Sequence, residues 1–234
     1  YLYTETGELS IEGTGTALDK KLYNAIGYEN SENLKSITFN TQTVESICDY
    51  WCDASKLSFI RDGVRYEYNL FKDIGGELVL PSNLKTIGDY AFRNCKGMYG
   101  NLIIPDGVTT IGNYAFYGDT GFTGTLSMSN LVTSIGDDAF EHCNFTGNLI
   151  LSSSLQSIGS RVFAYCSSFT GDLVIPNSVT SIGEYAFYNC SGLTGLTLSS
   201  GLTEIAQSAF YGCTSLAGNL VIPEGVVTIG RNAF

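Results

Sequence analysis

An isoleucine recurs every 23 or 24 residues from residue 87 onward, and this spacing constrains the fold more than any other feature of the sequence. Each isoleucine is followed by a phenylalanine five residues later and preceded by a leucine or valine three residues earlier. The isoleucines are Ile87, Ile111, Ile135, Ile158, Ile182, Ile205 and Ile229, and the phenylalanines are Phe92, Phe116, Phe140, Phe163, Phe187, Phe210 and Phe234. A unit this short cannot enclose a core alone, so neighbouring units must stack. The spacing therefore predicts a solenoid in which like side chains lie over one another.

Each unit is predicted to contain a short strand, a corner and a tight helical turn. Two apolar residues separated by one residue, such as Leu102 and Ile104, share a face of a strand and point inward. Pro105 then ends the strand, because proline has no amide hydrogen to donate to a ladder. The I-G-x-x-A-F segment has room for one helical turn. These features predict an α/β-type repeat solenoid with seven units over residues 78–234, the last of them truncated.

The repeat, seen clearly in VIPNSVTSIGEYAFYNCSGLTG at 174–195, resembles the BspA-like leucine-rich repeats of bacterial surface proteins. The resemblance covers residues 78–234. It implies a right-handed, curved leucine-rich repeat solenoid with a parallel sheet on the concave side and short helical turns on the convex side. Proline or serine stands where ordinary leucine-rich repeats have asparagine after the strand, so an asparagine ladder is not expected.

Residues 1–77 depart from this pattern, and two interpretations remain open. In the first, they form irregular repeats with a capping helix at about 16–26, because the ends of a solenoid need covering. The strands would then be Leu9–Ile11, Ile37–Phe39 and Leu57–Phe59, and Val44-x-x-Ile47 would repeat the turn signature. In the second, they form a separate small domain, with Lys56–Tyr68 as a hairpin about Asp62-Gly63.

The charge of the chain argues against several classes of partner. The net charge is −11, from 12 basic and 23 acidic side chains. Nucleic acids and anionic lipids attract basic surfaces, so neither is an expected partner. No apolar run approaches the length of a membrane span, so direct membrane insertion of this fragment is not expected. The last residues, 231–234, stop within a repeat, and we expect the chain to be a piece of a longer protein.

Five of the seven cysteines recur three residues after a repeat phenylalanine, and Asp119 takes this position in one unit. Stacked cysteines would lie about 5 Å apart with parallel side chains, whereas disulfides need converging Cβ atoms about 3.8 Å apart. We therefore expect reduced thiols in the core, at Cys95, Cys143, Cys166, Cys190 and Cys213. Cys48 and Cys52 lack a second pair for a metal site, and whether they are bonded to each other stays open.

Catalytic residues, metal ligands and cofactors are not expected. His142 is the one histidine and falls in a turn, where a solvated side chain is usual. Asp137 and Asp138 are adjacent and predicted to be exposed, so they do not form the spaced acid pair of a glycosidase.

Two stripes of side chains are the candidate ligand-binding residues. The apolar stripe is the outward residue of each strand: Val79, Ile103, Ser127, Ile150, Val174, Thr197 and Val221. The second stripe consists of tyrosines that flank Ala-Phe: Tyr90, Tyr114, Tyr117, Tyr185, Tyr188 and Tyr211. Tyrosine suits binding surfaces because it offers a large area at a small entropic cost. The alternatives are β-propensity on an open sheet for the first stripe and shielding of the phenylalanines for the second.

These features predict an extracellular or cell-surface-anchored module that binds a protein or glycan ligand through its solenoid face. Adhesion to host proteins is what the resemblance implies. The alternative is a structural spacer or stalk that presents another domain and has no ligand of its own.

Overall fold

The computed structural model describes residues 76–234 in full and, before them, the backbone of seven short strands. These strands are β1 (Leu2–Tyr3), β2 (Glu8–Ile11), β3 (Ala17–Leu18), β4 (Ser36–Phe39), β5 (Ser46–Ile47), β6 (Leu57–Arg61) and β7 (Val64–Tyr68).

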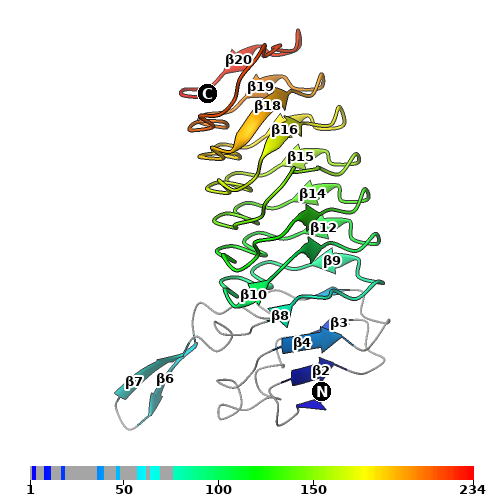
Figure 1. Cartoon of the computed structure of the whole chain (residues 1–234), viewed down its shortest axis with the longest axis vertical. Helices are drawn as coiled ribbons and strands as arrows, with labels where there is room; N and C mark the ends of the chain where they lie inside the picture. The colour runs from blue at the N-terminus through cyan, green and yellow to red at the C-terminus, as the bar shows by residue number, and fades with distance from the viewer. Residues whose placement is uncertain are drawn as a thin grey trace.

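The described chain winds into a parallel β-solenoid with one coil stacked on the next (Figure 1). A seven-stranded sheet runs along it in the order β17-β15-β14-β12-β9-β5-β3. Its strands from the regular repeats are β9 (Thr86–Ile87), β12 (Thr110–Ile111), β14 (Ser134–Ile135), β15 (Ser157–Ile158) and β17 (Ser181–Ile182). The register pairs each repeat isoleucine with the next, and β19 (Glu204–Ile205) pairs with β20 (Thr228–Ile229) in the same way. The predicted stacking of like residues is confirmed.

The L-x-I segments form parallel pairs of strands instead of one continuous sheet. The pairs at these segments are β11 (Leu102–Ile103) with β13 (Leu126–Ser127), and β16 (Gly171–Val174) with β18 (Leu193–Thr197). A third parallel pair, β8 (Gly76–Glu77) with β10 (Met98–Tyr99), lies just before the first two L-x-I segments. Pro105 and Pro176 follow two of these segments and have no amide hydrogen to extend the ladder. The longest sheet therefore lies at the Thr-Ile and Ser-Ile positions.

The predicted short helical turns are wrong, because the described residues contain no helix. The third residue after each repeat isoleucine has a left-handed backbone, with φ of 59° at Tyr90 and 54° at Tyr114. A left-handed residue in every coil interrupts a right-handed helix. The amides instead bond to the next coil: Tyr90 N–H donates to the Asn113 carbonyl at 2.8 Å, and Phe92 N–H donates to the Ala115 carbonyl at 2.7 Å.

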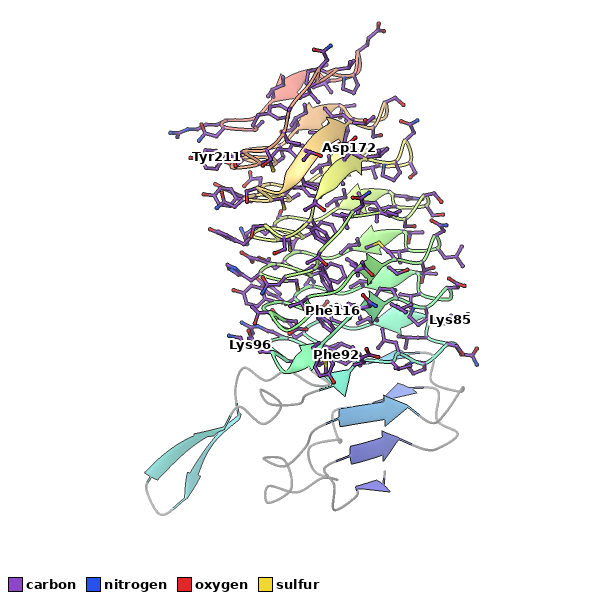
Figure 2. The ribbon with its side chains drawn as sticks, viewed as in Figure 1. Lys85, Phe92, Lys96, Phe116, Asp172 and Tyr211 are labelled. Atoms are coloured by element: carbon purple, nitrogen blue, oxygen red, sulfur yellow. The ribbon has the colours of Figure 1, made fainter. Side chains whose placement is uncertain are left out.

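Stacked phenylalanine rings form the centre of the core. Ring centroids of consecutive repeats lie 5.1 Å apart for Phe92 and Phe116, 5.3 Å for Phe116 and Phe140, and 5.5 Å for Phe140 and Phe163. Figure 2 shows Phe92 and Phe116 within the coils. A second row, Phe122, Phe145 and Phe169, meets the first row edge to face. Such ring pairs add roughly 0.5–1.5 kcal/mol each beyond area burial.

The five described cysteines are free and buried, as predicted. Each of the last four donates its thiol hydrogen to the carbonyl of a phenylalanine in an earlier coil: Cys143 to Phe116, Cys166 to Phe140, Cys190 to Phe163 and Cys213 to Phe187. Asp119 replaces the thiol in one coil, is fully buried, and accepts the Cys95 N–H at 2.7 Å. Cys48 and Cys52 lie outside the described residues.

The sheet continues into the first 75 residues, where β5 pairs with β9 and β3 pairs with β5, all parallel. Ile47 thereby lies beside Ile87. Strands β2 and β4 pair in parallel at Leu9–Ile37 and Ile11–Phe39, and β1 pairs with β2 antiparallel. Of the predicted helix at 16–26, Ala17–Leu18 are strand β3, and residues 16 and 19–26 lie outside the described residues.

The prediction that Leu57–Phe59 joins the parallel sheet is wrong. Strand β6 pairs antiparallel with β7, with Arg61 opposite Val64, as the hairpin interpretation predicted. An Asp-Gly pair favours a two-residue hairpin turn. The hairpin lies beside the stack of coils (Figure 1).

Candidate functional site

The apolar stripe lies on the outside of the L-x-I strands. Its valines and isoleucines, Val79, Ile103, Ile150, Val174 and Val221, are 55% to 76% exposed, and Ser127 and Thr197 are exposed too. Ile103 lies beside Ser127, and Val174 lies beside Thr197, in parallel register. The residues on either side of Ile103, Leu102 and Ile104, are buried, so the predicted alternation holds at this strand.

A groove of about 440 Å³ lies along part of this stripe. Val79, Ile103 and Ser127 line it, together with the acidic side chains of Glu77 and Asp106. The groove brings the first three members of the stripe together on one surface. The remaining members of the stripe lie on later coils.

Aromatic side chains form a continuous row along another surface of the coils. We call Tyr90, Tyr114, Tyr117, His142, Tyr165, Tyr185, Tyr188 and Tyr211 the tyrosine file. Neighbouring ring centroids lie 4.8 Å apart for Tyr90 and Tyr114, 5.6 Å for Tyr114 and Tyr117, and 5.2 Å for Tyr188 and Tyr211. Figure 2 places Tyr211 and Lys96 on the same side of the coils, opposite Lys85. All six predicted tyrosines belong to this file.

Two members of the file, His142 and Tyr165, escaped sequence reasoning. The His142 ring lies 5.9 Å from Tyr117 and 4.4 Å from Tyr165, and Tyr165 lies 5.3 Å from Tyr188. These contacts join the two halves of the file. Their shared position in the repeat could have identified them, because each lies two residues after a repeat phenylalanine, Phe140 or Phe163.

Left-handed backbone conformations position several of these side chains. His142 and Tyr165 have φ of 61° and 62°, and Tyr185 has φ of 59°. The left-handed region costs an L-residue about 1–2 kcal/mol. Inter-coil hydrogen bonds oppose this cost: the His142 amide donates to Ala164, and the Tyr165 amide donates to Tyr188.

A cation lies on the first three rings of the file. The guanidinium carbon of Arg93 is 5.3 Å from the ring centre of Tyr90, 5.6 Å from Tyr114 and 5.4 Å from Tyr117. Cations are attracted to aromatic faces by the ring quadrupole, and arginine is the more frequent cation in such contacts.

In the coil that carries His142, two acidic residues, Asp138 and Glu141, stand at the positions that tyrosine occupies in the preceding coil. Asp138 and Glu141 are buried, which corrects the predicted exposure of Asp138, while Asp137 is exposed as predicted. Arg161 Nε donates to Asp138 Oδ1 at 2.7 Å. Burial raises the pKa of Glu141 to about 8, and the hydrogen bond to Asp138 and its negative charge act in the same direction. These causes favour the protonated form of Glu141.

His142 lies at the border between this pair and the file. Burial lowers its pKa, and the positive charge of Lys96 lowers it further. Its side chain is 44% exposed, and its Nε2 atom is 3.7 Å from Glu141 Oε1. A neutral imidazole is thus favoured in the stack with Tyr165.

Metal-ligating side chains do not gather in the part of the chain that the structure describes: no group of three or more His, Cys, Asp or Glu is suitably placed there. Over the same residues, no helix has the length and apolar character to cross a bilayer.

The repeat is matched by a known family profile. The BspA type leucine-rich repeat region matches in six copies, over residues 64–171 and 165–234. The chain belongs to the BspA-type leucine-rich repeat family. This BspA-type chain is similar to the leucine-rich repeat protein TpLRR of T. pallidum, with 30% identity and a TM-score of 0.61 over 75% of this chain and 83% of that one.

A second solved structure shares the fold of the BspA-type chain. It is a leucine-rich cell surface protein from Faecalibacterium prausnitzii A2-165, at 20% identity and a TM-score of 0.52. The match covers 96% of this chain and 59% of that one. Among curated proteins, none matches the chain.

Proposed function

We propose that this BspA-type solenoid is a non-enzymatic interaction module that binds a protein or glycan ligand outside the cell. The tyrosine file is the observation that carries the proposal, because it presents aromatic rings and hydroxyls continuously along a surface. Tyr165 and Tyr211 are 41% and 42% exposed. Tyrosine is favoured in binding surfaces for its large, rigid contact area.

The main alternative for the file is that its rings shield the phenylalanine core. Three coils argue against this role. The residue after the phenylalanine is Arg93, Glu141 or Ala164 instead of tyrosine, yet Phe92, Phe140 and Phe163 remain fully buried. The core is therefore closed without a tyrosine at that position, and the tyrosines elsewhere are available for another role.

The proposed location is extracellular or anchored at the cell surface. The similar protein from Faecalibacterium prausnitzii is described as a cell surface protein, which supports this location. Adhesion to a host protein or glycan would fit such a location.

A structural spacer is the second candidate function. Its support is the uninterrupted pairing of coils through the seven-stranded sheet, which gives a rod with no need of a ligand. A spacer would bind nothing through either stripe.

Arrays of glycans and extracellular matrix proteins, probed with the 234-residue chain, separate the two candidates. We expect specific binding that is weakened by Tyr165→Ser with Tyr211→Ser on the file, or by Ile103→Ser with Val174→Ser on the apolar stripe. Binding that survives both sets of substitutions would place the ligand elsewhere. The absence of any ligand would favour the spacer, and turnover of a substrate by the purified chain would contradict the non-enzymatic assignment.

A further inference from the structure

The tyrosine file contains two clusters at equivalent positions of the repeat, and the first already holds an arginine. Tyr114 and Tyr117 lie three and six residues after Ile111, and Arg93 lies six residues after the preceding repeat isoleucine. Its guanidinium carbon is within 5.6 Å of both ring centres. The planar guanidinium suits such a site because it stacks on aromatic faces, which the compact ammonium of lysine does less well. Within the chain, a guanidinium thus already lies against this arrangement of tyrosines.

The second cluster repeats Tyr114 and Tyr117 without the arginine, while Arg161 stands at the position that corresponds to Tyr90. Tyr185 and Tyr188 lie three and six residues after Ile182, and Ala164 takes the position that corresponds to Arg93. The ring centroids of Tyr185 and Tyr188 are 5.6 Å apart, the same separation as for Tyr114 and Tyr117. The pair is preserved, but its internal cation is replaced by a methyl group.

Two further rings enlarge the second cluster. Tyr165 packs edge-on against Tyr188 at 5.3 Å, and Tyr211 stacks on Tyr188 at 5.2 Å. Tyr165 and Tyr211 are the two most exposed tyrosines of the file. Three rings, those of Tyr165, Tyr185 and Tyr211, therefore contact Tyr188, and Arg93 likewise contacts three rings.

The charges around this cluster favour a cation from outside. Over residues 76–234, the cation that lies on tyrosine rings is Arg93, in the first cluster. Arg161, in the same coil as Ala164, is directed to Asp138, to which it donates at 2.7 Å. Glu184, next to Tyr185, is exposed, and the chain carries a net charge of −11. The second cluster thus combines aromatic rings with a nearby exposed acidic side chain.

We propose that Tyr165, Tyr185, Tyr188 and Tyr211 bind an arginine side chain on the surface of a partner protein. The proposal rests on the proposed interaction function and names the chemistry of its ligand. The bound guanidinium lies against the exposed rings of Tyr165 and Tyr211, beside Tyr188, as Arg93 lies against Tyr117. A partner that presents one exposed arginine, set in an otherwise neutral or basic surface, fits this site.

The test is an NMR titration of the whole chain, labelled at its tyrosine rings, with an acetylated Gly-Arg-Gly-Arg-Gly peptide. Two matched peptides carry lysine or the neutral isostere citrulline. We expect saturable shifts of the four rings of the second cluster with the arginine peptide and weaker ones with lysine. Equal response to the lysine peptide would show general charge attraction and would overturn the proposal, as would equal response to citrulline.

Amino-acid substitutions in the chain provide a second test, which does not depend on comparing peptides. Tyr188→Ser is expected to weaken binding about two- to fivefold, the range for one exposed cation–π contact, whereas Tyr99→Ser, at an exposed tyrosine outside the file, leaves it unchanged. Arg93→Ala is expected to create a second arginine site at Tyr114 and Tyr117. Unchanged binding in the Tyr188 variant, or no new site in the Arg93 variant, would contradict the proposed equivalence of the two tyrosine clusters. Circular dichroism confirms that each variant is folded.

The arrays and the peptide titration together distinguish failure of the arginine site from failure of the proposed interaction function. If the arrays reveal a protein ligand whose binding is insensitive to Tyr188→Ser and to masking of its arginines, the interaction function stands and the arginine site is wrong. If the arginine peptide binds as expected but no macromolecule is captured, the site exists and the interaction function fails.

Discussion

The imidazole of His142 stacks on the ring of Tyr165 with centroids 4.4 Å apart and planes 10° apart. This contact is the bridge between the tyrosines of the early coils and those of the later coils, because the coils between them carry Asp138, Glu141 and Ala164 at the positions where tyrosine stands elsewhere. Its strength depends on the charge of the imidazole and on the acid pair beside it.

Protonation of His142 is expected to destabilise the folded chain. Its pKa is lowered on folding, first by burial and then by Lys96, so the neutral form is favoured. The stabilising contribution is present above the unfolded pKa of about 6.5 and is lost as the pH falls through the lower folded value. Urea unfolding at pH 4.5–7.5 should show a steeper loss of stability in the natural chain than in His142→Gln. Parallel curves of stability against pH for the two proteins would contradict the lowered pKa of His142.

Deprotonation of Glu141 is expected to destabilise the folded chain as the pH rises. Its pKa rises to about 8, from causes led by burial and the contact with Asp138, so the protonated form is favoured. This contribution is fully present below the ordinary glutamate pKa and is lost as the pH rises through about 8. Stability should therefore fall as the pH rises from about 4.5 to about 8, and Glu141→Gln should remove that fall. A carbon-13 titration of the side-chain carboxyl would report the midpoint directly, as a property of the coupled pair.

Asp119 is expected to destabilise the core relative to cysteine at the same position. Its fully buried carboxyl stands where four other coils place a thiol that donates to a phenylalanine carbonyl. Burying a carboxyl costs more than burying a thiol, so Asp119→Cys should stabilise the chain by about 1 kcal/mol or more. That corresponds to a rise in Tm of about 2–4 °C. Cys143→Asp is the reciprocal control and should lower Tm; a fall in both variants would argue against this account.

Phe140 is expected to be among the most sensitive core positions. It stacks between Phe116 and Phe163 and also meets the edge of Phe145. Phe140→Ala should cost about 3–5 kcal/mol, because the neighbouring coils cannot close the cavity. Phe234 is 47% exposed and stacks on one ring, Phe210, so Phe234→Ala should cost much less. Comparable losses in the two variants, measured by chemical unfolding, would contradict the ladder as the main source of stability.

The sequence predicted the core well because its signals are periodic. Ile87 and Ile111, or Phe92 and Phe116, are 24 residues apart and lie side by side, so the period translates directly into contacts. The buried thiols followed from the same argument. The hairpin at β6 and β7 also had a local signal in Asp62-Gly63, although it was one of two open interpretations.

Other features depend on contacts that no local pattern encodes. Two segments of each repeat have inward-pointing apolar residues, and periodicity could not decide which would form the longer sheet. The left-handed backbone at Tyr90 and Tyr114 was missed because tyrosine, unlike glycine or asparagine, carries no signal for that conformation. The burial of Asp138 depends on Arg161, which lies 23 residues later in the chain.

The amide ladder that replaces the predicted helical turns separates the framework of the molecule from its exterior chemistry. Main-chain groups such as Tyr165 N–H and Tyr188 C=O set the spacing between coils, and the side chains at those positions take no part in these bonds. Outer residues can therefore be exchanged one coil at a time while the pitch of the rod stays fixed. Such a scaffold lets new recognition properties arise by single substitutions without a compensating change in the interior.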